Sequence, residues 1–270
     1  KKKKKNKKKK KKWKKKRNCF FKETATTEIY TLSLQEALPK STTIIEEIQP
    51  HCAEAHAALA YCYKELGQID KSISSFQRYL EYGAERPDLV HAELAKLANA
   101  KEDYEETIKQ ANIALDYAKN VEAYKARGMA KYRQEKLSDA IRDMRLAVRC
   151  KPDDIESWYY VGLVAHDRRD TQELGSVIKQ LKRLGKTSLA NFMRMCSLNL
   201  KEQFSDALSL GQTLLDKFED DLWFVEEFLK ASEEVDINVI EAELPRFDLI
   251  HRENPYYQFL ASVALLEADK

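Results

Sequence analysis

The sequence predicts an all-α protein built as a solenoid of stacked helix–turn–helix repeats. Only 7 Gly and 6 Pro punctuate its 270 residues, which favours long helices joined by short connections. Apolar residues recur at the i, i+3, i+4 and i+7 spacing that marks one face of a helix. The same order of bulky, aliphatic and small residues then returns about every 34 residues, a period typical of repeat architectures.

The first helix of each expected repeat carries a bulky residue, an aliphatic residue three positions later and a small residue next to it. Four sets follow this order, namely His56, Leu59 and Ala60; His91, Leu94 and Ala95; Tyr124, Arg127 and Gly128; and Trp158, Val161 and Gly162. Arg127 departs from the pattern, because it replaces the aliphatic residue of its set. The regular spacing of the sets predicts equivalent helices in successive repeats.

The second helix of each expected repeat has a matching order of bulky, small and aliphatic residues. The sets are Ile69, Ser72 and Ile73; Tyr104, Thr107 and Ile108; Leu137, Ala140 and Ile141; and Phe204, Ala207 and Leu208. These residues lie on one face of a helix, and the small member lets a neighbouring helix approach closely. A compact helical bundle is the alternative, but it does not require a repeat of constant length.

This pattern resembles the tetratricopeptide repeat, a helix–turn–helix unit of 34 residues. The resemblance implies a right-handed superhelix over residues 42–270, with repeats at 53–87, 88–120, 121–154, 155–187 and 188–220, a degenerate repeat at 221–254 and a closing helix at 255–268. The family's signature is present only in pieces, since Ala111 stands where a large aromatic residue is usual. Pro245 predicts a kink or a late start in the last second helix.

Residues 1–41 are interpreted separately from the solenoid. Residues 1–17 hold 14 Lys and one Arg, and residues 24–41 resemble the translated product of a common sequencing adapter. We interpret the segment as an artefact and expect its Lys run to be disordered, because the run repels itself and can bury nothing. A genuine polybasic tail for nucleic acid or an anionic membrane is the alternative.

The charge of the remaining chain argues against several classes of partner. Residues 1–17 carry 15 of the 47 Lys and Arg, which leaves 32 basic against 44 acidic side chains, a net charge of −12. We therefore expect no nucleic acid to bind the folded body. No apolar run is long enough to span a membrane, so no membrane partner is expected. Five scattered cysteines suit reduced thiols in a cytoplasmic protein.

A concave groove lined by the first helices is the expected binding surface of such a solenoid. The predicted groove residues are Tyr61, Lys64, Lys96, Lys125, Tyr132, Arg133, Tyr159 and Arg168. Their positive charges and aromatic rings suit an acidic or mixed peptide, although solvated helix faces commonly carry the same residue types. The resemblance does not extend to binding of chaperone tails, because Ala57 and Tyr61 replace the Lys and Asn that such binding requires.

No residue pattern in the chain predicts catalysis, a metal site or a cofactor. His51, Cys52 and His56 lie close in sequence, but no second pair completes a set of four ligands. His166 is near Asp167 and Asp170, and we interpret this group as a surface charge cluster because adjacent residues on a helix point in different directions. The phosphate-loop, GxSxG and HExxH motifs are missing.

The sequence therefore predicts a non-catalytic scaffold or adaptor that binds a peptide or a helix of a partner protein in its groove. The alternative is the repeat region of a larger, truncated enzyme such as a glycosyltransferase, a phosphatase or a kinase. Self-association through the terminal helices is a further expectation, because neither end has an obvious polar cap.

Overall fold

The computed structural model describes residues 51–268, and the tail at residues 1–41 lies outside this range. Helices joined by short turns make up the described part, which contains no strand. The helices are α2 (Ala53–Glu65), α3 (Ile69–Glu81), α4 (Pro87–Ala100), α5 (Tyr104–Tyr117), α6 (Val121–Arg133), α7 (Leu137–Cys150), α8 (Ile155–Asp167), α9 (Thr171–Arg183), α10 (Thr187–Leu200), α11 (Phe204–Phe218), α12 (Leu222–Val235), α13 (Asn238–His251) and α14 (Pro255–Ala268).

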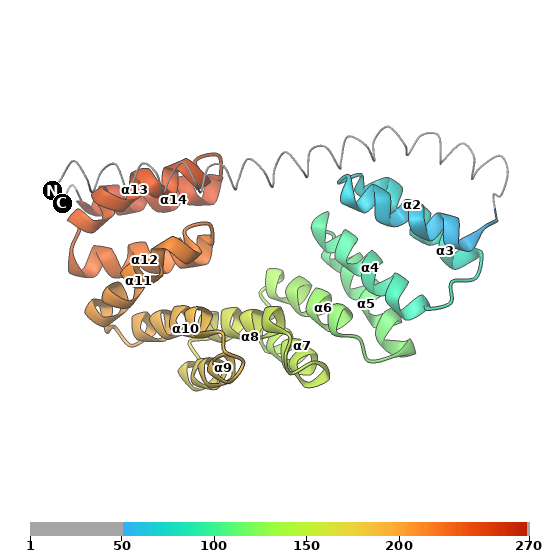
Figure 1. Ribbon diagram of the computed structural model, residues 1–270, viewed down its shortest axis with the longest axis horizontal. Helices are drawn as coiled ribbons and strands as arrows, with labels where there is room; N and C mark the ends of the chain where they lie inside the picture. Colours follow the sequence, from blue (N-terminus) through green and yellow to red (C-terminus); the bar gives the residue numbers. More distant parts are fainter. Residues whose placement is uncertain (1–50, 269–270) are drawn as a thin grey trace.

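The helices pack in consecutive pairs, from α2 with α3 to α12 with α13, and α14 closes the series against α12 and α13. The first helices of successive pairs also contact one another, from α4 with α6 to α12 with α14. Figure 1 shows the pairs following an arc, with α4, α6, α8 and α10 on its inner side. The predicted all-α solenoid is confirmed.

The turns between the two helices of a pair share one backbone geometry. A residue with positive φ follows each of the helices α2, α4, α6, α8 and α10. These residues are Gly67, Glu102, Glu135, Arg169 and Glu202. The next backbone N–H reaches back five residues, as from Lys136 to the Lys131 carbonyl at 2.9 Å. This is the hydrogen bond of a Schellman cap, in which glycine is the usual left-handed residue. Four of the five positions carry a residue other than glycine, so the backbone is strained there by contacts of the Cβ atom.

The small residues predicted at the helix crossings are fully buried. Ser72, Thr107, Ala140 and Ala207 all have exposed fractions of 0%. Ser72 also donates its hydroxyl to the Ala60 carbonyl at 2.7 Å, so its polar group is satisfied across the pair. Gly162 lies against the side chain of Met193, which occupies the space that a Cβ would need. These contacts explain why the repeat requires small side chains at these positions.

The core changes in character along the arc. Six alanines fill the interior between α4, α5 and α6, namely Ala92, Ala95, Ala111, Ala114, Ala123 and Ala126. From α7 to α14 the core is made of larger side chains, in which the ring of Phe224 meets Phe192 edge to face and stacks on Phe228. Close approach of the backbones replaces side-chain volume in the alanine cluster.

Pro245 does not delay the start of its helix. α13 begins at Asn238 and continues through Pro245 to His251. Pro245 is exposed, so the carbonyl that loses its helical donor is on the side of the helix that water can reach. The expectation of a late start is therefore wrong for this helix.

Candidate protein-binding groove

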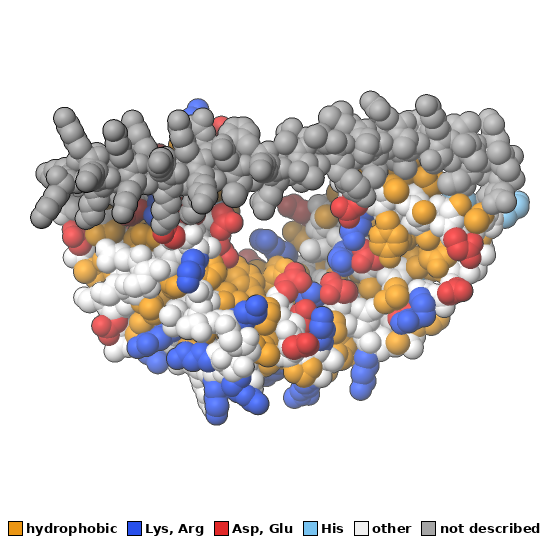
Figure 2. Space-filling model, in the orientation of Figure 1, with side chains coloured by type: hydrophobic (Ala, Val, Ile, Leu, Met, Phe, Trp, Pro, Cys, Tyr) orange, Lys and Arg blue, Asp and Glu red, His pale blue; other side chains and the backbone are white. Residues whose placement is uncertain are grey.

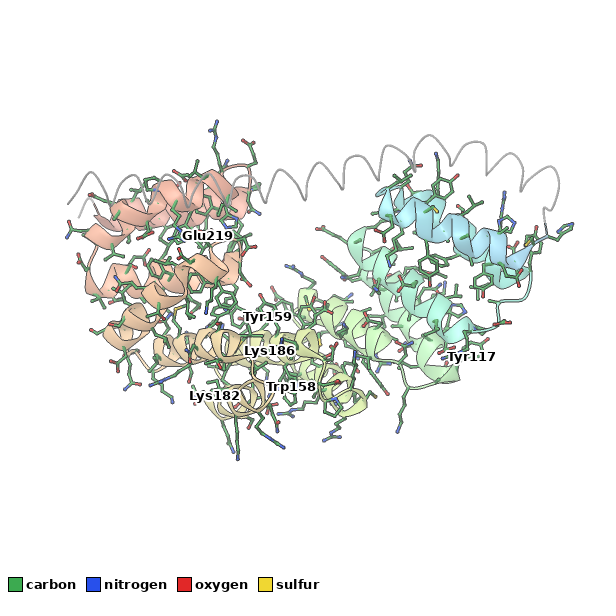
Figure 3. The ribbon with its side chains drawn as sticks, viewed as in Figure 1. Tyr117, Trp158, Tyr159, Lys182, Lys186 and Glu219 are labelled. Carbon is green, nitrogen blue, oxygen red and sulfur yellow. The ribbon has the colours of Figure 1, made fainter. Side chains whose placement is uncertain are left out.

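The eight predicted groove residues lie on first helices of the pairs or at the end of one. Tyr61 and Lys64 are on α2, Lys96 is on α4, and Lys125, Tyr132 and Arg133 are on α6; Tyr159 is on α8, and Arg168 follows it as the C-cap. Figure 3 shows Tyr159 on the inner side of the arc and Trp158, the residue before it, on the opposite side. Figure 2 shows this inner face hollowed between the two arms, with basic and acidic side chains side by side. The role of these residues in binding remains a prediction.

The three groove lysines alternate with glutamates of the neighbouring repeats. Lys64 Nζ lies 2.6 Å from Glu93 Oε2, and Lys96 Nζ lies 3.0 Å from Glu93 Oε1. Lys96 is also 3.7 Å from Glu122 Oε2 on the next first helix. The two lysines lower the pKa of the Glu93 carboxyl against the opposing effect of its burial. We call this series from α2 to α8 the ion-pair ladder.

Lys125 completes the ion-pair ladder and is 5% exposed. Its ammonium lies 2.8 Å from Glu122 Oε1 and 2.5 Å from Glu156 Oε2 on α8. Burial lowers the pKa of Lys125, but these two carboxylates outweigh it and raise the pKa well above its usual value. Lys125 therefore joins two repeats and has little surface to offer a partner. The sequence reasoning considered the lysines alone and missed the acidic residues that face them.

Arg133 and Arg168 are the exposed cations of the predicted set. Neither forms an ion pair with any other residue in the described range. Tyr61 is also exposed, and its ring packs edge-on against Phe76 with the Lys64 ammonium 5.8 Å from its centre. These three side chains remain open to a ligand.

Two predicted tyrosines bind carboxylates further along the groove. The Tyr132 hydroxyl donates to Asp167 Oδ2 at 2.5 Å, and the Tyr159 hydroxyl donates to Asp221 Oδ2 at 3.1 Å. Burial and these carboxylates raise the pKa of both hydroxyls above the usual range, so both stay protonated as donors. These two tyrosines therefore lie next to carboxylates on the C-terminal side of the ion-pair ladder.

Four carboxylates gather where α8, α12 and α14 meet the groove, and we call them the acidic cluster. They are Asp167, Asp221, Glu226 and Glu227. The rings of Tyr159 and His166 both pack against Trp223, with centroids 5.5 Å apart in each case. Sequence reasoning missed this cluster because α8 and α12 are two repeats apart in the chain. The run of acidic residues in α12 was its only signal.

His166 lies between two members of the acidic cluster. Its Nδ1 is 3.2 Å from Asp167 Oδ1, and its Nε2 is 3.1 Å from Glu227 Oε1 in ion-pair contact without hydrogen-bond alignment. Burial lowers the pKa of His166, but the two carboxylates outweigh it and raise the pKa to about 9. His166 is therefore an imidazolium at neutral pH. The expected surface charge cluster is in fact a partly buried, inter-repeat contact, because Glu227 comes from α12.

Glu226 has a different environment from its neighbour. Burial and the adjacent Glu227 raise its pKa, while a hydrogen bond from the Tyr256 hydroxyl and the charge of His166 act in the opposite direction. The same contact and burial raise the pKa of Tyr256 to about 12. Glu226 therefore carries its negative charge at an energetic cost that a nearby cation would relieve.

The residues weighed for metal binding have packing roles. His56 is buried with its ring 5.3 Å from that of Tyr82, which also contacts His51. No group of three or more His, Cys, Asp or Glu within residues 51–268 is arranged to hold a metal ion. The same residues contain no helix long and apolar enough to cross a membrane.

Comparison with known proteins gives a clear answer for the fold. No protein-family model matches the sequence, and no curated protein matches it either. Among solved structures, a tetratricopeptide repeat protein from Parabacteroides merdae is similar with a TM-score of 0.62 and 13% identity, over 80% of this chain and 90% of that one. The chain has a tetratricopeptide-repeat fold.

Other tetratricopeptide-repeat structures are similar over different lengths. Cut9–Hcn1, an APC/C hetero-tetramer, matches with a TM-score of 0.67 and 13% identity, over 87% of this chain and 46% of that one. YrrB, described as a TPR protein with an unusual peptide-binding site, matches with a TM-score of 0.51 and 17% identity, over 68% of this chain and 95% of that one. At these identities the matches establish the fold of this tetratricopeptide-repeat chain.

Proposed function

We propose that this tetratricopeptide-repeat chain is a non-catalytic scaffold or adaptor that binds an extended segment of a partner protein in its concave groove. The observation that carries the proposal is the inner surface formed by the first helices, which offers exposed aromatic and charged side chains from several repeats. Tyr61, Arg133 and Arg168 are examples from different parts of the arc. A surface of this extent suits an elongated ligand rather than a compact substrate. The peptide-binding site named for YrrB is consistent with this use of the fold.

The ion-pair ladder supports a scaffold role more than a role in recognition. Its members hold successive first helices together, which keeps the arc in one shape before a ligand arrives. A preorganised groove loses less conformational entropy on binding than a flexible one. The four cysteines in the described range are free thiols, which supports a proposed cytoplasmic location for the scaffold. The repeat region of a larger enzyme is a less favoured reading.

Site-specific crosslinking of selected peptides tests this function. Peptides would be selected from a random library against the full chain, and a photo-crosslinking residue would then replace Tyr61 or Met129 on first helices. The matched control places the same residue at Ser176, which is exposed on α9. We expect the selected peptides to crosslink from the first-helix positions and not from Ser176. Failure to select any peptide, or equal crosslinking from all three positions, would contradict the proposal.

Self-association is proposed as a second property because the C-terminal helices expose apolar residues. Leu249 on α13 is 81% exposed and Phe259 on α14 is 62% exposed. Large apolar side chains exposed to this extent on neighbouring helices favour association with another surface. Light scattering across a concentration series tests it. We expect a concentration-dependent dimer that the double variant Leu249→Lys and Phe259→Lys abolishes, and a monomer at every concentration would contradict the proposal.

A further inference from the structure

We propose that the C-terminal half of the groove binds the partner segment through a Lys or Arg side chain, which the acidic cluster holds. The inference rests on the proposed function and names the chemistry of its ligand. It reverses the expectation from sequence, in which basic groove residues recruit an acidic or mixed peptide. The charge balance of the ion-pair ladder and of the acidic cluster decides between a basic and an acidic ligand.

The charge balance differs between the two halves of the groove. In the ion-pair ladder, Glu93, Glu122 and Glu156 each lie within 4 Å of a lysine. In the acidic cluster, His166 is the only cation among residues 51–268 that is in ion-pair contact with any of the four carboxylates. His166 is in ion-pair contact with Asp167 and Glu227. Asp221 caps the N-terminus of α12, and Glu226 interacts with His166 only at longer range, so neither has a cation of the described range in ion-pair contact. Partly buried carboxylates without a counter-charge favour a cation at this place.

Unpartnered buried atoms provide a second, independent observation. Trp223 is 9% exposed, and its indole Nε1, a donor, has no acceptor. Asn199 is 2% exposed and donates Nδ2 to Glu227 Oε2 and to the Glu227 carbonyl, both at 2.8 Å, but its Oδ1 has no donor. Buried polar atoms without partners are uncommon because each costs about 1–3 kcal/mol. Both unpartnered atoms adjoin the acidic cluster, because Asn199 is hydrogen-bonded to Glu227 and Trp223 packs against Tyr159 and His166.

Aromatic rings complete the environment for a cationic side chain. Tyr159 and Trp223 stand edge to face with a centroid distance of 5.5 Å, and Tyr256 on α14 is 47% exposed beside Glu226. The face of such a ring attracts ammonium and guanidinium groups. A carboxylate in the same place would meet four carboxylates and a single imidazolium, a net negative charge that makes an acidic segment unfavourable here.

Fluorescence anisotropy with the full chain and defined peptides tests the inference. Three labelled probes of equal length would contain Lys and Arg, Glu and Asp, or Gln and Ser. We expect the basic probe to bind at least about tenfold more tightly than the neutral probe, and the acidic probe to bind least. The double variant Asp167→Asn and Glu226→Gln should lower affinity for the basic probe by about tenfold or more. Circular dichroism checks that this variant is folded.

A matched variant distinguishes binding at the acidic cluster from a general attraction of cations by the net negative charge of the folded protein. Glu81→Gln with Asp153→Asn removes the same charge from exposed positions outside the groove, and it should bind the basic probe as tightly as the original chain at moderate salt. Equal losses in both variants, or no loss in the Asp167 and Glu226 variant, would overturn the inference. So would equal binding of the acidic probe.

The remaining outcomes identify which proposal fails. Neutral or acidic peptides that crosslink from the groove would overturn the inference and leave the proposed function standing, whereas the absence of any groove-bound peptide would overturn both. The Lys run of residues 1–17 is a competing cation within the chain. If the basic probe binds only after those lysines are replaced by serine, the site belongs to the chain's own N-terminal segment and the choice of a partner protein is overturned.

Discussion

Arg127 on α6 and Asp143 on α7 form a bidentate ion pair within the third repeat. Arg127 Nε donates to Asp143 Oδ2 at 2.9 Å, and Nη2 donates to Oδ1 at 2.7 Å. Lys131 adds a third bond to Asp143 at 2.8 Å. Because Asp143 is 2% exposed, this pair explains how an arginine occupies the position that is aliphatic in the other repeats.

Removal of Asp143 alone should destabilise the protein strongly. Asp143→Ala removes the carboxylate that pairs with Arg127 and Lys131 and leaves Arg127 only its hydrogen bond to Asn112. The loss of one partner of a buried pair costs about 3–5 kcal/mol. The double variant Arg127→Leu and Asp143→Ala should lose less, because it leaves Lys131 as the one unpaired charge. Urea denaturation measures both values. Asp139→Ala is the control on the same helix, since its pair with Arg142 is exposed and is worth less than about 1 kcal/mol.

The strained turns predict a gain in stability from glycine. Glu135 has a φ of 61°, and a left-handed side-chain residue costs about 1–2 kcal/mol, of which the entropy of glycine offsets about 0.5–1 kcal/mol. Glu135→Gly should therefore raise the free energy of unfolding by up to about 1.5 kcal/mol. The opposite change, Gly67→Ala, should lower it, because Gly67 has a φ of 69°. A destabilised Glu135→Gly protein would show that this turn is not strained.

The alanine cluster should resist the residue that the repeat pattern would favour. Ala111 is fully buried among the other alanines of α4, α5 and α6, where the helices are already in close contact. Ala111→Leu should therefore destabilise the protein by about 1–3 kcal/mol through overpacking. Ala118→Leu, at an exposed position just after α5, should change the stability by less than about 0.5 kcal/mol. A stabilised Ala111→Leu protein would instead reveal unfilled space.

The sequence was sufficient for the fold but not for the chemistry of the groove. Apolar periodicity located the packing positions, because Ser72, Thr107, Ala140 and Ala207 recur with the repeat. It could not show that Lys125 meets Glu156 or that His166 meets Glu227, since these pairs depend on how one repeat is rotated on the next. Nor could it show left-handed turns at positions occupied by glutamate. Charge in a solenoid groove is set by inter-repeat geometry, which a single repeat does not encode.

The His166 contacts predict that stability falls as the pH rises from about 6.5 to 9. The folded pKa of about 9 lies above the ordinary value of 6.5, so the folded state binds a proton that the unfolded state releases. The stabilisation is complete below pH 6.5 and is lost as the pH passes through 9. A shift of this size corresponds to about 3 kcal/mol at most.

Urea denaturation at several pH values measures this dependence. His166→Gln should be less stable than the original chain at pH 6 and should show a smaller change between pH 6 and pH 9.5, because it has no proton to lose. His51→Gln, at an exposed position, should retain the dependence of the original chain. An unchanged pH dependence in His166→Gln would mean that Asp167 and Glu227 do not hold a charged imidazole, and the acidic cluster would then lack its one internal cation.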